Sequence, residues 1–190
     1  MTMTRSSLLS HLEIAHLIWE KHLKKNSMVV DATCGNGHDS YFLANILTSG
    51  HLYCIDVQQN AIENTKKKLE MYRNISFIQD CHSNLEKHIN HGIDLIVYNL
   101  GYLPGSDKTI KTLKDTTITS LKKSLSLLNP NGLITITSYP GHFEGKEEKK
   151  AIYKELESID NSEFSVYCYH SFFENAPSIF FVSKKIKKID

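Results

Sequence analysis

The chain has 190 residues, of which 41% are hydrophobic, and its 22 basic and 21 acidic residues give a net charge of +1 with histidine neutral. This length suffices for the buried core of one domain, and the balanced charge does not by itself indicate a nucleic-acid partner. No segment is apolar for long enough to cross a bilayer, and the N-terminal segment lacks the continuous apolar run of a signal peptide, so we expect a cytoplasmic protein.

Strand-like and helix-like segments alternate along the chain. Apolar residues at helical spacing within residues 8–23 predict an opening helix. Short apolar runs then predict strands at residues 28–30, 52–57, 75–78, 93–100 and 133–139. The segments between them predict helices at residues 39–47 and 59–71, a helix ending near Leu128 before the turn Asn129-Pro130-Asn131-Gly132, and a charged helix at residues 146–159.

The alternation predicts an α/β fold with a doubly wound, Rossmann-like sheet, because strands joined by helices pair in parallel through right-handed crossovers. The last two β segments, 164–173 and 178–183, lie too close together for a crossover helix and predict an antiparallel hairpin. We therefore expect one domain over residues 1–190, with a mostly parallel seven-stranded sheet, a C-terminal hairpin, and residues 1–26 packed on the sheet as a helix.

The loop after the first strand reads Asp31-Ala-Thr-Cys-Gly-Asn-Gly-His-Asp39. Gly35 and Gly37 permit a tight turn that a ligand can approach closely, and the loop opens a helix whose free N–H groups favour electron-rich ligand atoms. Ligands of parallel sheets bind beyond the carboxyl ends of the strands. The pattern indicates a cofactor site, although a Gly-x-Gly after a strand also occurs in simple turns.

Two further strand ends carry polar residues suited to a nucleoside. Asp56 ends the second strand and can accept hydrogen bonds from both ribose hydroxyls, or it can cap the next helix. Asp80, Cys81 and His82 follow the third strand, where an adenine edge would be read, although His82 also fits an ordinary loop histidine.

The charge of the glycine loop discriminates between cofactors. A dinucleotide needs a seat for its pyrophosphate, usually Gly-x-Gly-x-x-Gly, and here Ser40 occupies the third glycine position. Asp31 and Asp39 would repel a diphosphate but suit the sulfonium and ammonium groups of S-adenosylmethionine. The residues therefore favour S-adenosylmethionine over NAD.

The fourth strand ends in Asn99-Leu-Gly-Tyr-Leu-Pro-Gly105. An asparagine carbonyl and neighbouring backbone carbonyls can hold an amine by its N–H groups and aim its lone pair at a methyl group, while an aromatic ring packs on the acceptor. The turn therefore predicts an acceptor site for amine methylation. A purely structural turn is the alternative.

The motifs DATCGNGHDS, CIDVQQNAIENT, YNLGYLPGSDKTI, Thr116-Thr117 and SYPGHFEGKEE, in this order, resemble the signatures of one bacterial family, the YtqB-like rRNA methylases. Members of the MnmM type are tRNA 5-aminomethyl-2-thiouridine methyltransferases. The resemblance covers residues 28–150 and implies a class I S-adenosylmethionine-dependent methyltransferase fold. Cys81 departs locally from the pattern, because a small residue such as glycine also fits there.

The residues and the resemblance together indicate three sets of site residues. The catalytic residues would be Asn99, Tyr102 and His142. The cofactor-binding residues would be Asp31, Gly35, Asn36, Gly37, Asp39, Asp56, Gln58, Cys81 and His82. The substrate-binding residues would be Gly101, Leu103, Lys108 and Tyr139, with Pro140 and Gly141 beside them.

The reaction implied is methylation of the primary amine of 5-aminomethyl(-2-thio)uridine at the tRNA wobble position. The amine must arrive neutral, so the site needs a proton acceptor, for which His142, Asp107 and water are candidates. The wobble base lies in the single-stranded anticodon loop and can enter a pocket and stack on Tyr102. Lys108, Lys111 and Lys114 follow the acceptor turn and predict phosphate contacts.

Other interpretations stay open. The same fold could act on rRNA or on a small amine, and a non-enzymatic nucleotide- or RNA-binding protein or an NAD-dependent enzyme is also conceivable. The four scattered cysteines and the isolated His88-x-x-His91 pair do not predict a metal site or a disulfide framework. The sequence is compatible with a homodimer but does not require one.

Overall fold

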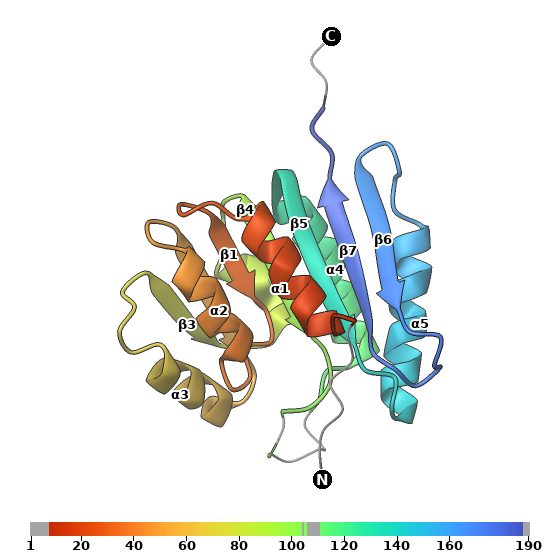
Figure 1. The fold of residues 1–190 in the computed structure, drawn as a ribbon, viewed down its shortest axis with the longest axis horizontal. Coiled ribbons are helices and arrows are strands. Elements are labelled where there is room, and N and C mark those ends of the chain that lie inside the picture. Colours follow the sequence, from red (N-terminus) through yellow and green to blue (C-terminus); the bar gives the residue numbers. More distant parts are fainter. Residues whose placement is uncertain (1–7, 104, 106–110, 188–190) are drawn as a thin grey trace.

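A computed structural model describes residues 8–103, 105 and 111–187 of the chain. Within these residues one sheet has the strand order β3-β2-β1-β4-β5-β7-β6 (Figure 1). The strands are β1 (Met28–Asp31), β2 (His51–Asp56), β3 (Ile75–Gln79), β4 (Ile93–Asn99), β5 (Leu128–Ser138), β6 (Phe164–His170) and β7 (Ser178–Lys184). The helices are α1 (His11–His22), α2 (His38–Ile46), α3 (Gln59–Lys68), α4 (Lys114–Leu127) and α5 (Phe143–Glu157), with a 3-10 helix, η1 (His82–Lys87).

The sheet has the topology that the sequence predicts. The first five strands pair in parallel, with Val30 opposite Tyr53 of β2 and Ile96 of β4. β7 inserts antiparallel between β5 and β6, so the hairpin completes a seven-stranded, mostly parallel sheet. Because the chain order reverses beside β1, the loops after β1, β2 and β4 meet at the same edge of the sheet.

Helices cover both faces of the sheet, as a doubly wound fold requires (Figure 1). One core cluster joins α1, α2 and α3 to sheet residues such as Val29, Leu52 and Leu95. The other cluster joins η1, α4 and α5 to residues such as Val30, Ile96 and Phe180. No helix in the described part of the chain is long and apolar enough to cross a membrane.

The opening helix α1 is anchored on the first of these faces. Ser10 and Glu13 form a capping box that fixes its start. Trp19, which is 1% exposed, donates its indole N–H to the Thr135 hydroxyl of β5 at 3.1 Å. The His16 ring stacks on Phe42 of α2 with centroids 4.0 Å apart. These contacts fix the position of α1 on this face of the sheet.

The structure differs from the sequence prediction at several element boundaries and in one added element. Leu128 belongs to β5, where it pairs with Ile93, rather than to the preceding helix. The predicted turn at residues 129–132 is an irregularity inside that strand, with Asn131 at φ 65°. α3 ends at Lys68 rather than near Met71, and η1 is an additional element that no apolar periodicity announces.

Removal of the Trp19 side chain should cost much of the stability that α1 contributes. We expect Trp19→Ala to lower the free energy of unfolding by about 3–5 kcal/mol, because it leaves a cavity and an unpaired Thr135 hydroxyl. Leu17→Ala on the exposed side of the same helix should change it by about 0.5 kcal/mol or less. Urea unfolding followed by tryptophan-independent circular dichroism measures both, and equal effects would contradict the packing described.

Candidate functional site

The glycine loop between β1 and α2 is built for close approach. Gly35 and Gly37 lie at φ 50° and 72°, which L-residues rarely adopt. A Cβ atom at Gly37 would come within 3.0 Å of the Thr65 Cα of α3, and the Thr65 hydroxyl donates to the Gly35 carbonyl at 3.0 Å. The Asn36 side-chain carbonyl accepts from Asn64 at 3.0 Å. Contacts with α3 therefore fix the conformation of the loop.

Asp56 links this loop to the start of α3. One carboxylate oxygen accepts from the Gly35 N–H and the other from the Gln58 N–H, both at 3.0 Å. Burial raises the pKa of the carboxyl, and the backbone hydrogen bonds oppose that shift. Each carboxylate oxygen can still accept another hydrogen bond, so Asp56 can receive a ribose hydroxyl while it fixes the loop.

Asp31 lies beneath the loop and is 1% exposed. Its carboxyl accepts from the Ser40 hydroxyl at 2.5 Å and from the Thr33 N–H at 3.3 Å. Burial, followed by the charge of Asp39, raises its pKa to about 7. Ser40, at the third glycine position of a dinucleotide motif, is the partner of this buried acid. Asp31 therefore supports the loop from inside, and Asp39 is the acid at its surface.

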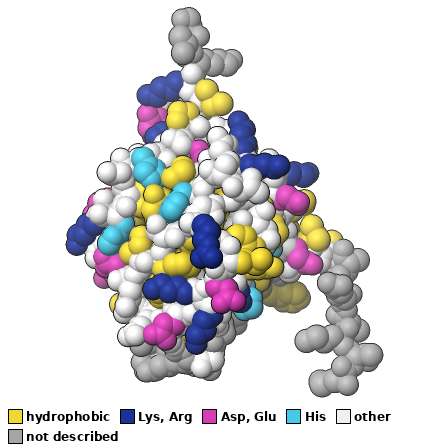
Figure 2. All heavy atoms as spheres, turned by 90° about the vertical axis from the view of Figure 1, so that its left-hand side faces the viewer, with side chains coloured by type: hydrophobic (Ala, Val, Ile, Leu, Met, Phe, Trp, Pro, Cys, Tyr) yellow, Lys and Arg dark blue, Asp and Glu magenta, His cyan; other side chains and the backbone are white. Residues whose placement is uncertain are grey.

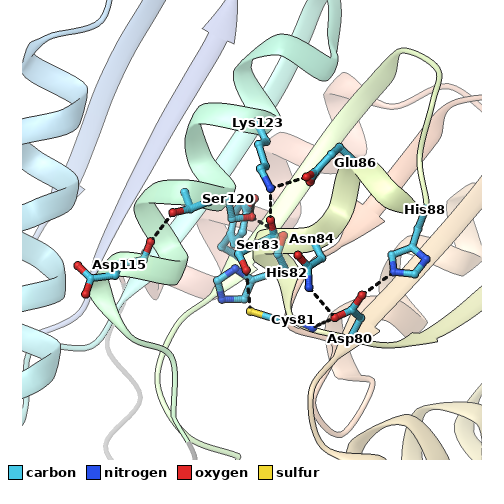
Figure 3. A network of polar contacts seen from close by, with 12 residues as sticks. Asp80, Cys81, His82, Ser83, Asn84, Glu86, His88, Asp115, Ser120 and Lys123 are labelled. Carbon is cyan, nitrogen blue, oxygen red and sulfur yellow. Dashed lines mark hydrogen bonds and ion pairs between the residues drawn. The ribbon is translucent and has the colours of Figure 1, made fainter.

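The segment after β3 forms a dense polar network with α4 (Figure 3). Asp80 accepts from Asn84 at 2.9 Å and contacts His88 at 2.8 Å, and these hydrogen bonds lower its pKa to about 2. Ser120 of α4 donates to the His82 carbonyl at 2.9 Å, and Lys123 donates to the Ser83 carbonyl at 2.6 Å. The backbone of residues 80–83 is consequently fixed at the edge of the sheet.

His82 has an unusual environment inside this network. The side chain lies edge-on against Tyr98 and is 6% exposed, and its Nδ1 atom has no hydrogen-bond partner among the described residues. Burial lowers the pKa of the imidazole to about 4, so the ring is neutral at pH 7. A buried polar atom without a partner is costly, and a bound ligand with a donor or acceptor would satisfy it.

Asn99, at the end of β4, joins the glycine loop to the acceptor turn. Its Nδ2 donates to Asp39 Oδ2 at 2.8 Å, and its Oδ1 accepts from the Tyr139 hydroxyl at 3.0 Å. The second Asp39 oxygen lies 2.7 Å from His16 Nε2 of α1. His11 Nε2, also of α1, lies 3.2 Å from the Tyr139 hydroxyl. These five side chains form one continuous polar chain across four elements.

The acceptor turn itself is held by a buried acid. The Gly101 N–H donates to the Thr112 hydroxyl at 2.9 Å, and that hydroxyl donates to Glu148 of α5 at 3.0 Å. Glu148 is 3% exposed, and it also accepts from Thr117 at 2.6 Å. Burial raises its pKa. Thr117 and Glu148, which belong to two of the motifs that resemble the family, are therefore in contact, and Glu148 positions the turn through Thr112.

Leu103 brings the acceptor turn against the glycine loop. Its side chain is buried, and its Cδ1 would lie only 3.2 Å from a Cβ at Gly35. Its role in this structure is packing between the two loops. Gly101, at φ 132°, lies beside the ring of Tyr139. The two halves of the predicted site are therefore in direct contact.

Tyr102 and His142 lie near each other beside the acceptor turn. Tyr102 is 41% exposed, and its ring centroid lies 6.3 Å from that of His142. His142 Nδ1 accepts from the Gly145 N–H at 3.0 Å and caps α5, so this nitrogen already has a structural hydrogen bond. A Cβ at Gly145 would collide with the Tyr139 carbonyl at 2.3 Å, so only glycine fits there.

The predicted basic residues are only partly placed. Lys108 and the alternative proton acceptor Asp107 lie outside the described residues. Lys111 forms an ion pair with Glu144 at 2.9 Å, and Lys114 is the first residue of α4. On the face turned toward the viewer in Figure 2, side chains of both signs are intermingled rather than gathered into one basic patch. The described residues contain no cluster of three or more candidate metal ligands.

Sequence reasoning missed His11, His16, Thr112 and Glu148. The two histidines interrupt the apolar face of α1, but nothing in the sequence pairs them with residues of β5 and α2. Thr112 and Glu148 carry only the general signal that a buried acid needs hydroxyl partners. Each of these residues acts through a long-range contact that a single sequence does not display.

The comparisons with known proteins were consistent with one another. Residues 52–184 match the profile of a family described as "Putative rRNA methylase". A chloroplastic tRNA (mnm(5)s(2)U34)-methyltransferase from Arabidopsis thaliana is 36% identical over 154 residues, which are 74% of this chain and 56% of the relative. The chain thus spans little more than half the length of that relative. A small-subunit ribosomal RNA methyltransferase H from Streptococcus dysgalactiae is 38% identical over 87 residues, 42% of this chain and 28% of the relative.

Two solved structures agree with the fold over nearly the whole chain. A protein from Clostridium thermocellum with the same family description has a TM-score of 0.91 and 34% identity, with coverage of 94% of this chain and all of the other. A Streptococcus mutans protein described as a methyltransferase, solved in complex with SAH, has a TM-score of 0.85 and 31% identity, with 93% and 99% covered.

The buried acid beneath the loop should make stability depend on pH. The folded pKa of Asp31, about 7, lies above its ordinary value of 3.8, so the folded state binds the proton more tightly than the unfolded state. Stability is therefore lost as pH rises from about 4 to about 7, by on the order of 4 kcal/mol.

Asp31→Asn, which is neutral throughout, should lack this loss. The unfolding free energy of wild type minus that of Asp31→Asn, measured by urea titration from pH 4 to pH 8, should fall as pH rises. Asp115→Asn, on an exposed carboxylate of α4, is the matched control and should give a nearly flat difference. A flat difference for Asp31→Asn as well would show that Asp31 ionises normally.

Proposed function

The chain belongs to the rRNA methylase family, and on that premise we propose that it is an S-adenosylmethionine-dependent methyltransferase. Its acceptor is the primary amine of 5-aminomethyl(-2-thio)uridine at the wobble position of tRNA, and its product is 5-methylaminomethyl(-2-thio)uridine. One observation carries the proposal. The Asn99 amide joins the glycine loop, through Asp39, to the acceptor turn, so a donor in one half lies next to an amine in the other.

The residues at the strand ends fit S-adenosylmethionine. Gly35 and Gly37 leave a cradle that side chains would fill, Asp56 can accept from the ribose hydroxyls, and the unpartnered Nδ1 of His82 lies where the base would be read. Asn36, Gln58 and Cys81 adjoin these residues in the chain. When bound there, this cofactor supplies a methyl group on a positively charged sulfur, which the negative charge of Asp39 favours.

The residues of the acceptor turn fit an amine. Asn99 Oδ1 and the backbone carbonyls near Gly101 can accept the amine N–H groups and so direct the nitrogen lone pair into the crevice. Tyr102, half exposed at the rim, can stack on the base. Partial burial of the site favours the neutral amine, the only form with a lone pair. Most of the rate acceleration then comes from the alignment of the two reacting centres.

The names of the relatives support a tRNA substrate more than an rRNA substrate. The relative named for tRNA position 34 matches 74% of this chain, whereas the relative named for small-subunit rRNA matches 42%. Phosphate contacts by Lys108 and Lys114 belong to the same proposal, because both follow the acceptor turn in the sequence. An rRNA or small-amine substrate would appear as methyl transfer to those acceptors but not to tRNA.

The proposal includes the domain organisation, the location and the oligomeric state of the protein. We infer that residues 1–190 act as one methyltransferase domain in the cytoplasm, on the anticodon loop, without a metal ion. A homodimer is part of the inference, and sedimentation velocity tests it. Cofactor binding and methyl transfer to tRNA are measured independently of these properties.

Calorimetric titration of the purified chain tests the cofactor. We expect binding of S-adenosylmethionine and of S-adenosylhomocysteine and none of NAD. Asp56→Asn should weaken binding by roughly 10- to 100-fold, the worth of a charged hydrogen bond. Asn99→Ala should retain the affinity for the cofactor but lose most of the turnover on tRNA that carries the aminomethyl group. Binding of NAD in place of S-adenosylmethionine would refute the assignment.

A further inference from the structure

Methylation of an amine releases one proton, and the contacts of Tyr139, which the sequence indicated only as a substrate-binding residue, bear on where that proton goes. The methylated nitrogen carries a positive charge until it loses that proton. His142 is poorly placed to accept it at Nδ1, because that atom already accepts from the Gly145 N–H. The hydroxyl of Tyr139 is closer to the acceptor turn, since it contacts Asn99 Oδ1 at 3.0 Å.

The orientation of the Asn99 amide is set by its other neighbour. A carboxylate can only accept hydrogen bonds, so Asn99 must present its NH₂ group to Asp39 and its carbonyl to Tyr139. The Tyr139 hydroxyl has one proton, which it donates to Asn99 Oδ1. His11 Nε2 lies 3.2 Å from the same hydroxyl and can accept that proton in the tautomer that carries its hydrogen on Nδ1. The His11 and Tyr139 rings meet edge-on with centroids 5.6 Å apart.

We propose that Tyr139 and His11 form a proton relay from the acceptor amine to the surface of α1. The inference rests on the proposed function. The amine nitrogen gives its lone pair to the methyl carbon, and the C–S bonding pair stays on sulfur. One proton of the resulting ammonium passes to the Tyr139 oxygen while the Tyr139 proton passes to His11 Nε2. The product amine is neutral, Tyr139 is restored, and His11 leaves as an imidazolium that exchanges its proton with solvent.

The electrostatics of the two residues fit these roles. Partial burial lowers the pKa of His11, an effect that the charge of Asp39 opposes, so the ring is neutral and able to accept at pH 7. Burial and the charge of Asp39 raise the pKa of Tyr139 to about 12. A free tyrosinate is therefore unfavourable, and the two protons move together.

The groups that face His11 are few in the described structure. Tyr139, directly after β5, contacts it, and Asp39 at the start of α2 acts through its charge. His16 of α1 occupies the other oxygen of Asp39. β7, which also packs on α1, carries one titratable residue, Lys184, whose ammonium donates to the Leu128 carbonyl at the opposite end of the strand. One of the ionisations that slow the reaction at acid pH should therefore be that of His11.

Two variants test the relay. His11→Gln and Tyr139→Phe should bind S-adenosylmethionine within about threefold of wild type but lower the single-turnover rate on aminomethyl-tRNA by roughly 10²-fold or more. The double variant should be hardly slower than either single variant, because the two residues act in sequence on one proton. His22→Gln, at the far end of α1 and bonded to the Asp94 carbonyl, is the matched control and should keep the wild-type rate.

The decisive measurements are the pH profile of the rate and the NMR titration of the His11 ring. In wild type the rate should fall at acid pH through two ionisations, that of the substrate amine and that of His11, and His11→Gln should lose the one whose apparent pKa equals the pKa measured for the His11 ring. The His11 titration needs no turnover, and Tyr139→Phe should shift it. An unchanged acid limb in His11→Gln, or losses that multiply in the double variant, would overturn the relay.

Failure of the proposed function is distinguishable from failure of the relay. A wild-type chain that binds S-adenosylmethionine but leaves aminomethyl-tRNA unmodified would refute the substrate, and the relay with it. A wild-type chain that methylates this tRNA while His11→Gln and Tyr139→Phe retain its rate would refute the relay alone.

Discussion

The side-chain amide of Asn99 is held between a group that can only accept, Asp39, and a hydroxyl that donates to it, Tyr139. This pair of hydrogen bonds fixes which end of the amide faces the acceptor turn. It also ties the start of α2 to the ends of β4 and β5. His16 and His11 then connect α1 to both partners. The opening helix thus supports the geometry of the crevice as well as covering the sheet.

The surrounding carboxyl groups fall into two classes, those buried in the protein and those that can bind a ligand. Asp31 and Glu148 are buried and satisfied by hydroxyl groups, so they brace the glycine loop and the acceptor turn at the expense of raised pKa values. Asp39 and Asp56 reach the crevice and keep capacity for ligand hydrogen bonds. A negative, partly desolvated crevice attracts a sulfonium group but repels RNA phosphates. Contacts to the RNA backbone should therefore come from residues around the rim.

The sequence was informative where the signals are local. Apolar periodicity placed the strands and helices, and the φ angles of Gly35 and Gly37 are those that the glycine loop requires. The polar chain across the site was not predictable, because His11 and Tyr139 are 128 residues apart and meet only through the fold. The packing of Leu103 and the cap formed by His142 likewise depend on neighbours in space. The strand start at Leu128 follows from its pairing with Ile93, which overrides the helical pattern of the residues before it.

Transfer of a labelled methyl group tests the central claim most directly. The purified chain is incubated with S-adenosylmethionine carrying a trideuterated methyl group and with tRNA that contains 5-aminomethyl-2-thiouridine, and the nucleosides are analysed by mass spectrometry. We expect one trideuterated methyl group on the side-chain amine of the wobble nucleoside and none elsewhere. Label on a ring atom, on a ribose or on another nucleoside, or no label in a chain that binds the cofactor, would contradict it.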